Sequence, residues 1–377
     1  MGAVEHLKTL CRLGLKPEGA MIAVTPVLHE IIPHGATRIV LLEPDATIGA
    51  GYAEHPATGP TLREHAWRFM DDPSSVGGLF KPCFQANAIG WTLHLQGRGW
   101  MDSGWYREVE ASLDSCWILD AMIGDAGRTI AWVNLTRPRG ARRFTVDDVQ
   151  RLDLVRPWLA HAFRRSKSGN VRQEDQSPKG AAGAPVQSGQ LIVTADARLV
   201  YQTAGLEHRL RILMGEPGNY TRFVPARESL PPPVLKLIRQ ITGAANGSAN
   251  APPRMRVSTA YGVLTLEAKW LVPAGTIAED VAKDPKTCLI AVTIELHEHA
   301  MAHAARVLRE SGATPTQVRA GIQLALGKSK PMIADELGIR FCSVADLTKR
   351  LYQTLGVHNA AGLGTKIWLR QKPCETD

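Results

Sequence analysis

The chain has 377 residues, of which 44% are hydrophobic, and carries a formal net charge of +8, so it is long enough for two or three domains with their own cores. No segment approaches the run of about 20 apolar residues that spans a bilayer, and the first residues lack the basic and apolar regions of a secretory signal. The six cysteines are scattered without a Cys-x-x-Cys pair, which argues against a zinc site or a disulfide framework and favours a reducing cytoplasm.

The N-terminal elements mix helices with strands. Apolar residues recur at helical spacing in two early segments, and a short apolar run then favours a strand. Two further strand-like segments flank a loop rich in Gly and Asp, as in a β-hairpin. Thr145 can cap the helix that follows, with Asp147 and Asp148 near the positive end of its dipole. We expect these elements at residues 7–13, 22–28, 37–42, 115–123, 129–137 and 145–165.

The end of this region carries a recognisable pattern. The second hairpin strand ends in Asn134-Leu135-Thr136-Arg137, and Phe144-Thr145 with Asp148 then opens the exit helix. Residues 17–165 therefore resemble a GAF-like sensory domain. The resemblance implies a central antiparallel sheet and a domain that occupies residues 1–168.

Tryptophan is concentrated in the same region, which holds seven of the nine in the chain. Trp combines a large apolar surface with one hydrogen-bond donor, which suits a pocket for a flat or aromatic small molecule. Plain core packing is the alternative, and most of these side chains must serve it. The candidate pocket residues are Trp67, Trp91, Trp100, Trp105 and Trp117, with His94 and Arg98 as candidate polar anchors.

The middle of the chain is preceded by a flexible stretch. Residues 169–190 are rich in Gly, Pro, Ser and Gln without apolar periodicity, which predicts a linker. Residues 191–298 then show strand, turn and strand, a helix near 234–241, a hairpin around Tyr261-Gly262 and a last strand near 287–296. This segment resembles a PAS-like domain, which implies five strands with helices on one face. A connecting helix is expected at residues 299–312, with Met301, Ala304, Ala305 and Leu308 on its apolar face.

The C-terminal residues, 313–377, predict a bundle of short helices. Gly327 ends one helix, Ser329 is placed to cap the next, and Pro331 lies in its first turn. Gly338 makes a turn into a third helix over residues 342–355. The apolar positions that we expect to face inward in the second and third helices are Met332, Ile333, Leu337, Ile339, Val344, Leu347, Leu351 and Leu355.

These residues resemble the DNA-binding domain of LuxR-type transcription regulators, over about residues 313–368. The match includes Thr314-Pro315, Gly327, Ile333-Ala334 and Leu355-Gly356-Val357. It implies a helix-turn-helix whose third helix enters the major groove. The chain departs from the family at four places, where members carry an acid after Thr-Pro, a capping Ser, a His and a Lys. In this chain the four places hold, in the same order, Thr316-Gln317, Arg340, Leu347 and Thr354. We therefore expect weaker helix initiation and weaker anchoring to DNA phosphates.

The outward face of the third helix supplies the candidate DNA contacts. Lys349 and Arg350 suit phosphates or base edges, and Ala345 suits a thymine methyl group. Asp346 repels phosphate unless it accepts from a cytosine amino group or pairs with Arg350. The full set of candidate DNA-binding residues is Lys328, Lys330, Arg340, Ser343, Ala345, Asp346, Lys349 and Arg350.

The basic charge is unevenly distributed. Residues 314–372 contain nine Lys and Arg against three Asp and Glu, and residues 137–172 contain ten against three. The first zone fits a polyanionic partner. For the second zone, a solvated helix face with a linker is favoured over a further DNA contact.

Catalytic and metal motifs are weak. His29 and His34 are one residue too far apart for the zinc-protease His-Glu-x-x-His, and Pro33 would break that helix. His297 and His299 would share one side of an extended chain, but without further ligands a solvated linker face is favoured. Nucleotide-binding loops and nucleophile elbows are missing from the sequence. We expect no catalytic residue, no cofactor and no metal site.

Together these patterns predict an α+β protein: GAF-like and PAS-like antiparallel-sheet sensory domains followed by an all-α helix-turn-helix domain. The predicted function is a cytoplasmic, ligand-responsive transcription regulator that binds double-stranded DNA as a homodimer. A small molecule sensed by the N-terminal domain would change the geometry of the dimer. The alternatives are a signalling module whose altered helix-turn-helix docks a protein partner, and an enzyme regulated by its sensory domain.

Overall fold

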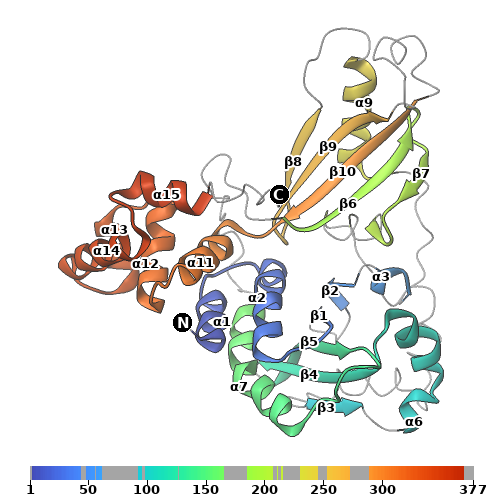
Figure 1. The fold of residues 1–377 in the computed structure, drawn as a ribbon, viewed down its shortest axis with the longest axis horizontal. Coiled ribbons are helices and arrows are strands. Elements are labelled where there is room, and N and C mark those ends of the chain that lie inside the picture. Colours follow the sequence, from blue (N-terminus) through green and yellow to red (C-terminus); the bar gives the residue numbers. More distant parts are fainter. Residues whose placement is uncertain are drawn as a thin grey trace.

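The computed structural model describes residues 2–43, 48–55, 57–61, 92–95, 98–125, 127–164, 185–206, 210, 214, 230–244, 253–271 and 288–368. Over these residues the protein is mixed α+β. Two five-stranded antiparallel sheets are followed by a group of C-terminal helices, as Figure 1 shows.

The first sheet has the strand order β2-β1-β5-β4-β3. Its strands are β1 (Ala36–Leu42), β2 (Ile48–Ala53), β3 (Thr92–Leu95), β4 (Trp117–Asp125) and β5 (Arg128–Arg137). The predicted hairpin is therefore confirmed as β4 and β5, whose pairing extends to Asp125 and Arg128. Residues 117–123 of β4 are all buried, because both faces of the sheet are covered at this strand.

The helices α2 (Pro17–Ile31) and α7 (Val146–Phe163) cover one face of the first sheet, and α1 (Ala3–Cys11) packs on both of these helices. Short helices cover the other face: α6 (Arg98–Met101) and the helical turns at Tyr106–Glu110 and Ala111–Leu113. A further short helix, α3 (Thr58–Thr61), follows β2. The α2 helix ends two residues before Pro33, as expected from the ring that Pro33 would place in the preceding turn.

The start of α7 confirms the predicted cap. Thr145 accepts a hydrogen bond from the backbone amide of Asp148, and the Asp148 carboxylate accepts one from the Thr145 amide. The same carboxylate pairs with the buried Arg137 guanidinium, Nη1 to Oδ2 3.2 Å. Arg137, which begins the second basic zone, is therefore neutralised inside the fold and does not lie on a solvated face.

The second sheet repeats the strand order of the first, β7-β6-β10-β9-β8. Its strands are β6 (Pro185–Thr194), β7 (Leu199–Gln202), β8 (Arg254–Ser258), β9 (Val263–Leu271) and β10 (Leu289–His297), and α9 (Pro232–Ala244) packs on β8 and β9. The predicted linker is too long at its C-terminal end, because residues 185–190 already belong to β6. They pair with β10, which supplies the hydrogen-bond partners that composition alone does not reveal.

The C-terminal helices are α11 (Ala300–Glu310), α12 (Pro315–Ala325), α13 (Lys330–Leu337), α14 (Phe341–Leu355) and α15 (Ala360–Trp368). Ala304, Ala305 and Leu308 of α11 are buried as predicted, whereas Met301 is half-buried. The prediction of a solvated linker at residues 297–299 is wrong for two of its residues. His297 and Glu298 are buried, and the Glu298 carboxylate accepts from His303 and Arg306 of α11.

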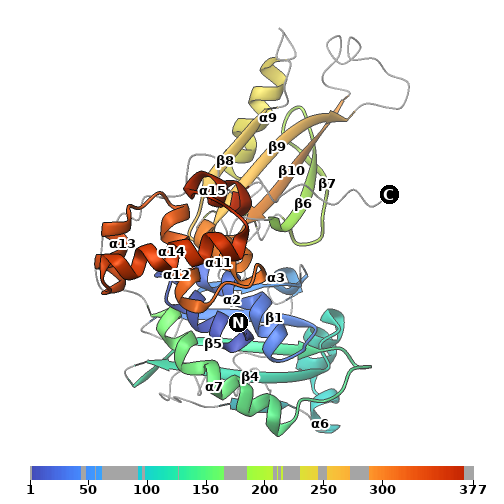
Figure 2. The ribbon, with the colours of Figure 1, turned by 60° about the vertical axis from the view of Figure 1, so that its left-hand side comes forward.

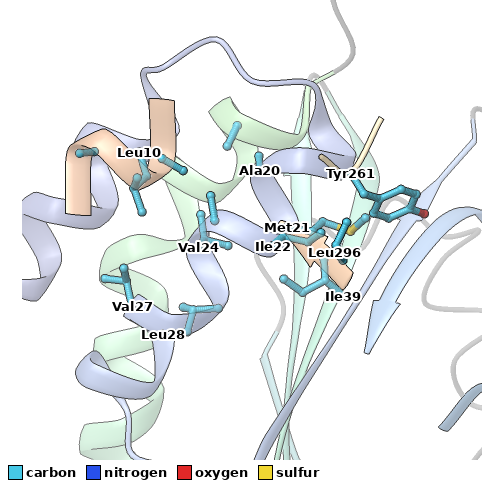
Figure 3. Close-up of a cluster of buried hydrophobic side chains, with 14 of the residues drawn as sticks. Leu10, Ala20, Met21, Ile22, Val24, Val27, Leu28, Ile39, Tyr261 and Leu296 are labelled. Carbon is cyan, nitrogen blue, oxygen red and sulfur yellow. The ribbon is translucent and has the colours of Figure 1, made fainter. Parts of the chain in front are cut away.

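The three parts meet around α1 and α2. The helices α11 and α12 pack on α1, and Figures 1 and 2 show the C-terminal group beside the N-terminal helices. In Figure 3, Tyr261 and Leu296 of the second sheet lie beside Met21, Ile22 and Ile39 of the first part. The Tyr261 hydroxyl donates to the Gly51 carbonyl, 3.2 Å away. The described residues include no helix with the length and apolar content needed to cross a membrane.

Candidate functional site

The segment from α13 to α14 has the helix boundaries that the sequence predicts. Gly338 adopts the left-handed conformation, with φ of +65°, and the Ile339 amide donates to the Ala334 carbonyl at 3.0 Å. This geometry ends α13 and redirects the chain into α14 within three residues. Ile333 of α13 and Val344 and Leu351 of α14 are fully buried, so the two helices share one core with α12.

The first helix of this group has a stronger start than expected. Thr314 accepts from the Gln317 amide, and the Gln317 side chain accepts from the Thr314 amide at 2.8 Å. This is a reciprocal capping box, in which glutamine serves as well as an acid. The expectation that Gln317 weakens helix initiation is therefore wrong.

Three smaller predictions about the bundle need correction. Ser329 is the N-cap residue of α13 but its side chain forms no capping hydrogen bond. Pro331, the second helical residue, has no amide hydrogen, so of the two amides that such a cap usually binds only that of Met332 remains. Met332 is 52% exposed. Beside Leu347 on α14 it is Thr348 that is buried, and its hydroxyl donates to the Val344 carbonyl. Leu347 is half-buried.

The candidate DNA contacts on α14 lie on one exposed surface. Ser343, Asp346 and Arg350 are separated by three and four residues, so they share a helix face. Lys349 and Arg340 are exposed beside them, and Ala345 is half-buried. Within the described part of the chain, Asp346 and Arg350 form no ion pair, although they are one helical turn apart.

Two lysines at the start of α13, Lys328 just before it and Lys330 as its first residue, differ from that surface. Lys328 and Lys330 are only half-exposed, and Lys328 forms an ion pair with Glu336 of α13. The ammonium group of Lys328 is therefore partly neutralised where it stands. Lys349 and Arg350 form no ion pair with any residue that the structure describes, and they carry the clearest positive charge of the α14 surface.

The predicted ligand residues separate into two groups. Trp100 and Trp105 lie together in a cluster with Val109, Leu113 and Ile118, on the face of the first sheet opposite α2 and α7. Trp117 is on the other face and donates to the Ala141 carbonyl. The predicted candidates Trp67 and Trp91 lie outside the described residues, as do the side chains of His94 and Arg98.

Beside Trp100 and Trp105, three strands carry a row of buried polar side chains that the sequence reading missed. Arg38 of β1 pairs in register with Asn134 of β5, which pairs with Asp120 of β4. The Arg38 guanidinium binds the Glu110 carboxylate through two hydrogen bonds, and Trp105 Nε1 donates to the same carboxylate at 3.1 Å. The sequence contains one indication of this row: charged residues stand at inward-facing positions of otherwise apolar strands, where charged side chains are rare.

Asp120 is the most unusual member of this row. Its Oδ1 accepts from Asn134 at 2.7 Å and from Trp132 Nε1 at 2.6 Å. Burial raises the pKa of Asp120 to about 7, against the opposing effect of these two hydrogen bonds. Asp120 Oδ2, Asn134 Oδ1 and Arg38 Nε are buried and have no hydrogen-bond partner among the residues that the structure describes. Such orphaned atoms are costly, and a bound small molecule is one way to satisfy them.

Comparisons with known proteins leave the family open. No family model matches the chain, and no curated protein matches it. Among solved structures, a "Sensor region of a sensor histidine kinase" is 12% identical, and the match covers 72% of this chain and 86% of that one, with a TM-score of 0.17. A TM-score at this level carries no argument about the fold.

Proposed function

We propose that this protein is a ligand-responsive transcription regulator that binds double-stranded DNA through α13 and α14. The observation that carries this proposal is the α14 surface. A short turn at Gly338 leaves the outer face of α14 exposed, and that face carries Arg340, Lys349 and Arg350. A helix held in this way is suited to the major groove, with its cations on phosphates and base edges.

The two sheets supply the sensory part of the proposal. Their shared strand order supports two units of one architecture, which we assign as GAF-like and PAS-like. The small-molecule ligand would bind on the first sheet, where Trp105 adjoins the row of Arg38, Asn134 and Asp120. In a homodimer, a ligand that favours one arrangement would shift the spacing of the two α14 helices relative to half-sites about 34 Å apart.

The test is a binding titration of the full chain on the DNA upstream of its own coding region, across a salt series. We expect affinity to fall steeply with salt, because phosphate contacts release counterions. Lys349→Ala/Arg350→Ala removes two such contacts and should lower affinity at every salt concentration, with a salt slope that is smaller by about 2.

A matched control separates the α14 surface from general positive charge. Lys236 and Arg239 are two exposed cations on α9, far from α14 in the sequence. Lys236→Ala/Arg239→Ala changes the net charge by the same amount and should leave affinity and salt slope unchanged. Equal losses in both double variants would show that binding is not localised to α14.

A second candidate function has its own support. Phe341 is 55% exposed and Met332 is 52% exposed, both in the α13 and α14 segment, and Asp346 would face any phosphate. Exposed apolar groups of this kind suit a protein partner. Binding to DNA that is absent at all salt concentrations, with and without added ligand candidates, would favour this docking function.

A further inference from the structure

Two histidines and a glutamate converge at one end of α2. His29 lies in the last turn of α2, His34 in the connection to β1, and Glu54 directly after β2. Each residue offers one ligand atom, a ring nitrogen of each histidine and a carboxylate oxygen of Glu54, and these three atoms lie within 4.8 Å of one another. All three side chains are half-buried, so solvent and small ions can reach them.

Backbone carbonyls settle the protonation of one nitrogen on each ring. His29 Nδ1 is 3.1 Å from the His34 carbonyl oxygen, and His34 Nδ1 is 2.5 Å from the Ile32 carbonyl oxygen. A carbonyl oxygen only accepts, so each Nδ1 carries the hydrogen and donates it. This second contact is the one that orients metal-binding histidines and leaves Nε2 as the ligand atom.

The two Nε2 atoms have different surroundings. His29 Nε2 lies 2.8 and 3.0 Å from the two Glu54 carboxylate oxygens. A bare lone pair facing a carboxylate is repulsive, so a positive centre belongs between them, either a proton on Nε2 or a cation. His34 Nε2 lies 2.6 Å from the Thr37 hydroxyl. Because Nδ1 of this ring carries the hydrogen that is donated to the Ile32 carbonyl, the lone pair on Nε2 of the neutral ring can accept from the Thr37 hydroxyl.

We propose that His29 Nε2, His34 Nε2 and the Glu54 carboxylate bind one divalent transition-metal ion, with Zn²⁺ the best match. Two imidazole nitrogens and one carboxylate form a common zinc ligand set, with a fourth position left for water or a small ligand. The Thr37 amide donates to Glu54 at 2.6 Å and orients the carboxylate. When the metal binds, it replaces the proton on His29 Nε2, which is released to solvent.

Binding requires a defined local movement. The two imidazole rings are stacked, with centroids 3.7 Å apart and planes 8° from parallel. The lone pairs lie in the ring planes, so parallel rings do not point at one ion. One ring must tilt, and His34 Nε2 must release the Thr37 hydroxyl, so that the ligand atoms close to separations of about 3.4 Å around bonds of about 2.0–2.1 Å. His34 is placed to move because its segment lies outside both α2 and β1.

The residues next to this cluster contact the other two parts of the molecule. Glu30, next to His29, forms an ion pair with Arg309 of α11. Gly51 and Tyr52 of β2, just before Glu54, are hydrogen-bonded by Tyr261 and Gln187 of the second sheet. An ion that draws α2 and β2 together therefore acts on two of the elements that contact the other parts of the chain.

The test uses the full chain after treatment with a chelator. We would titrate it with ZnCl₂ by calorimetry and with CoCl₂ by visible absorption. We expect one equivalent of Zn²⁺ to bind with release of protons, and Co²⁺ to give the absorption bands of a four- or five-coordinate site. Glu54→Gln and His34→Gln should each lower zinc affinity more than about tenfold, since even outer-shell partners are typically worth 10–100-fold.

Two further variants keep the result interpretable if the ligand variants misfold. His161 and His358 are exposed elsewhere on the molecule, and His161→Gln/His358→Gln should leave zinc affinity unchanged. Thr37→Val has nearly the same shape and removes only the hydroxyl that competes for His34 Nε2. It should bind zinc about two- to tenfold more tightly, the value of one ordinary hydrogen bond. No stoichiometric binding, or binding lost only in the His161→Gln/His358→Gln variant, would overturn the proposal.

Discussion

At the scale of single residues, Asp120 is the side chain whose environment departs most from that of its type. It is buried on a central strand and accepts two hydrogen bonds at Oδ1, and in the described part of the chain its Oδ2 has no hydrogen-bond partner. A charged carboxylate in this position loses its hydration without a direct cation contact. The protonated form is the better fit to the folded state, which makes the stability of the protein dependent on pH.

The direction of this dependence follows from the raised pKa of Asp120, about 7 in the folded protein against about 3.9 for an unperturbed Asp. Between these values the folded state holds more protons, so stability falls as pH rises, by at most about 1.4 kcal/mol per pH unit. Asp120→Asn keeps an acceptor for Asn134 and Trp132 and cannot ionise. We expect its midpoint of thermal unfolding to exceed that of the wild type at pH 8 by more than it does at pH 5.

The control is Asp346→Asn, the same exchange at an exposed carboxylate, which should shift the midpoint equally at both values of pH. Parallel pH curves for the wild type and Asp120→Asn would contradict the prediction. The orphaned Asp120 Oδ2 also makes this residue a marker for the ligand. A molecule that donates to it should lose affinity in Asp120→Asn.

The residues that make up the candidate sites were harder to predict than the elements that hold them. His29 and Glu54 are 25 positions apart, and Arg38 and Glu110 are 72 apart. No local rule links such pairs, because the sheet register and the helix packing bring them together. Composition groups Trp117 with Trp100 and Trp105, although strand alternation places it on the opposite face from Ile118.

At the scale of elements, the starts of α7 and α12 are set by matching capping boxes. Thr145 with Asp148 and Thr314 with Gln317 each satisfy two backbone amides reciprocally. Thr314→Ala removes one of these hydrogen bonds from α12. We expect the free energy of opening α12 to fall by about 0.5–2 kcal/mol. Amide hydrogen exchange across α12 measures this local change without unfolding the whole chain.

Thr316 provides the matched control two residues away. It is exposed in the first turn of α12, beyond the capping position. Thr316→Ala is the same chemical change without loss of the cap, and it should leave exchange in α12 slow. Equal acceleration by both variants would mean that the capping box contributes nothing to the stability of α12.

Element boundaries were predictable wherever the signal is local. Caps, Pro in a first turn and left-handed Gly all act within a few residues, and the helices at α7, α12, α13 and α14 start or end where these residues stand. Composition predicts a start of β6 that is too late in the sequence, because residues 185–190 have the composition of a linker. Their pairing with β10, about a hundred residues away, outweighs that composition.

At the scale of the whole molecule, the three parts are joined by a small number of specific contacts around α2. Tyr261 links the second sheet to β2, and Arg309 of α11 links the C-terminal helices to Glu30 of α2. Apolar packing of α11 and α12 on α1 surrounds the second link. Any signal from the first sheet that reaches α14 through this junction must move α11 relative to α2.

The Glu30 and Arg309 pair allows this junction to be tested by charge exchange. Arg309 binds both Glu30 oxygens, and the pair is partly exposed, with side-chain exposures of 44% and 19%. Glu30→Arg and Arg309→Glu each place like charges together, so we expect faster hydrogen exchange in α11, an effect on the order of 1 kcal/mol. The double variant restores an opposite pair and should recover slow exchange, as a double-mutant cycle requires.

Arg319→Glu, at an exposed cation on α12, repeats the charge change without the pair and should leave α11 unaffected. If the free-energy changes of the two single variants simply add in the double variant, the ion pair does not hold α11 against α2. Apolar packing on α1 must then stabilise the junction alone.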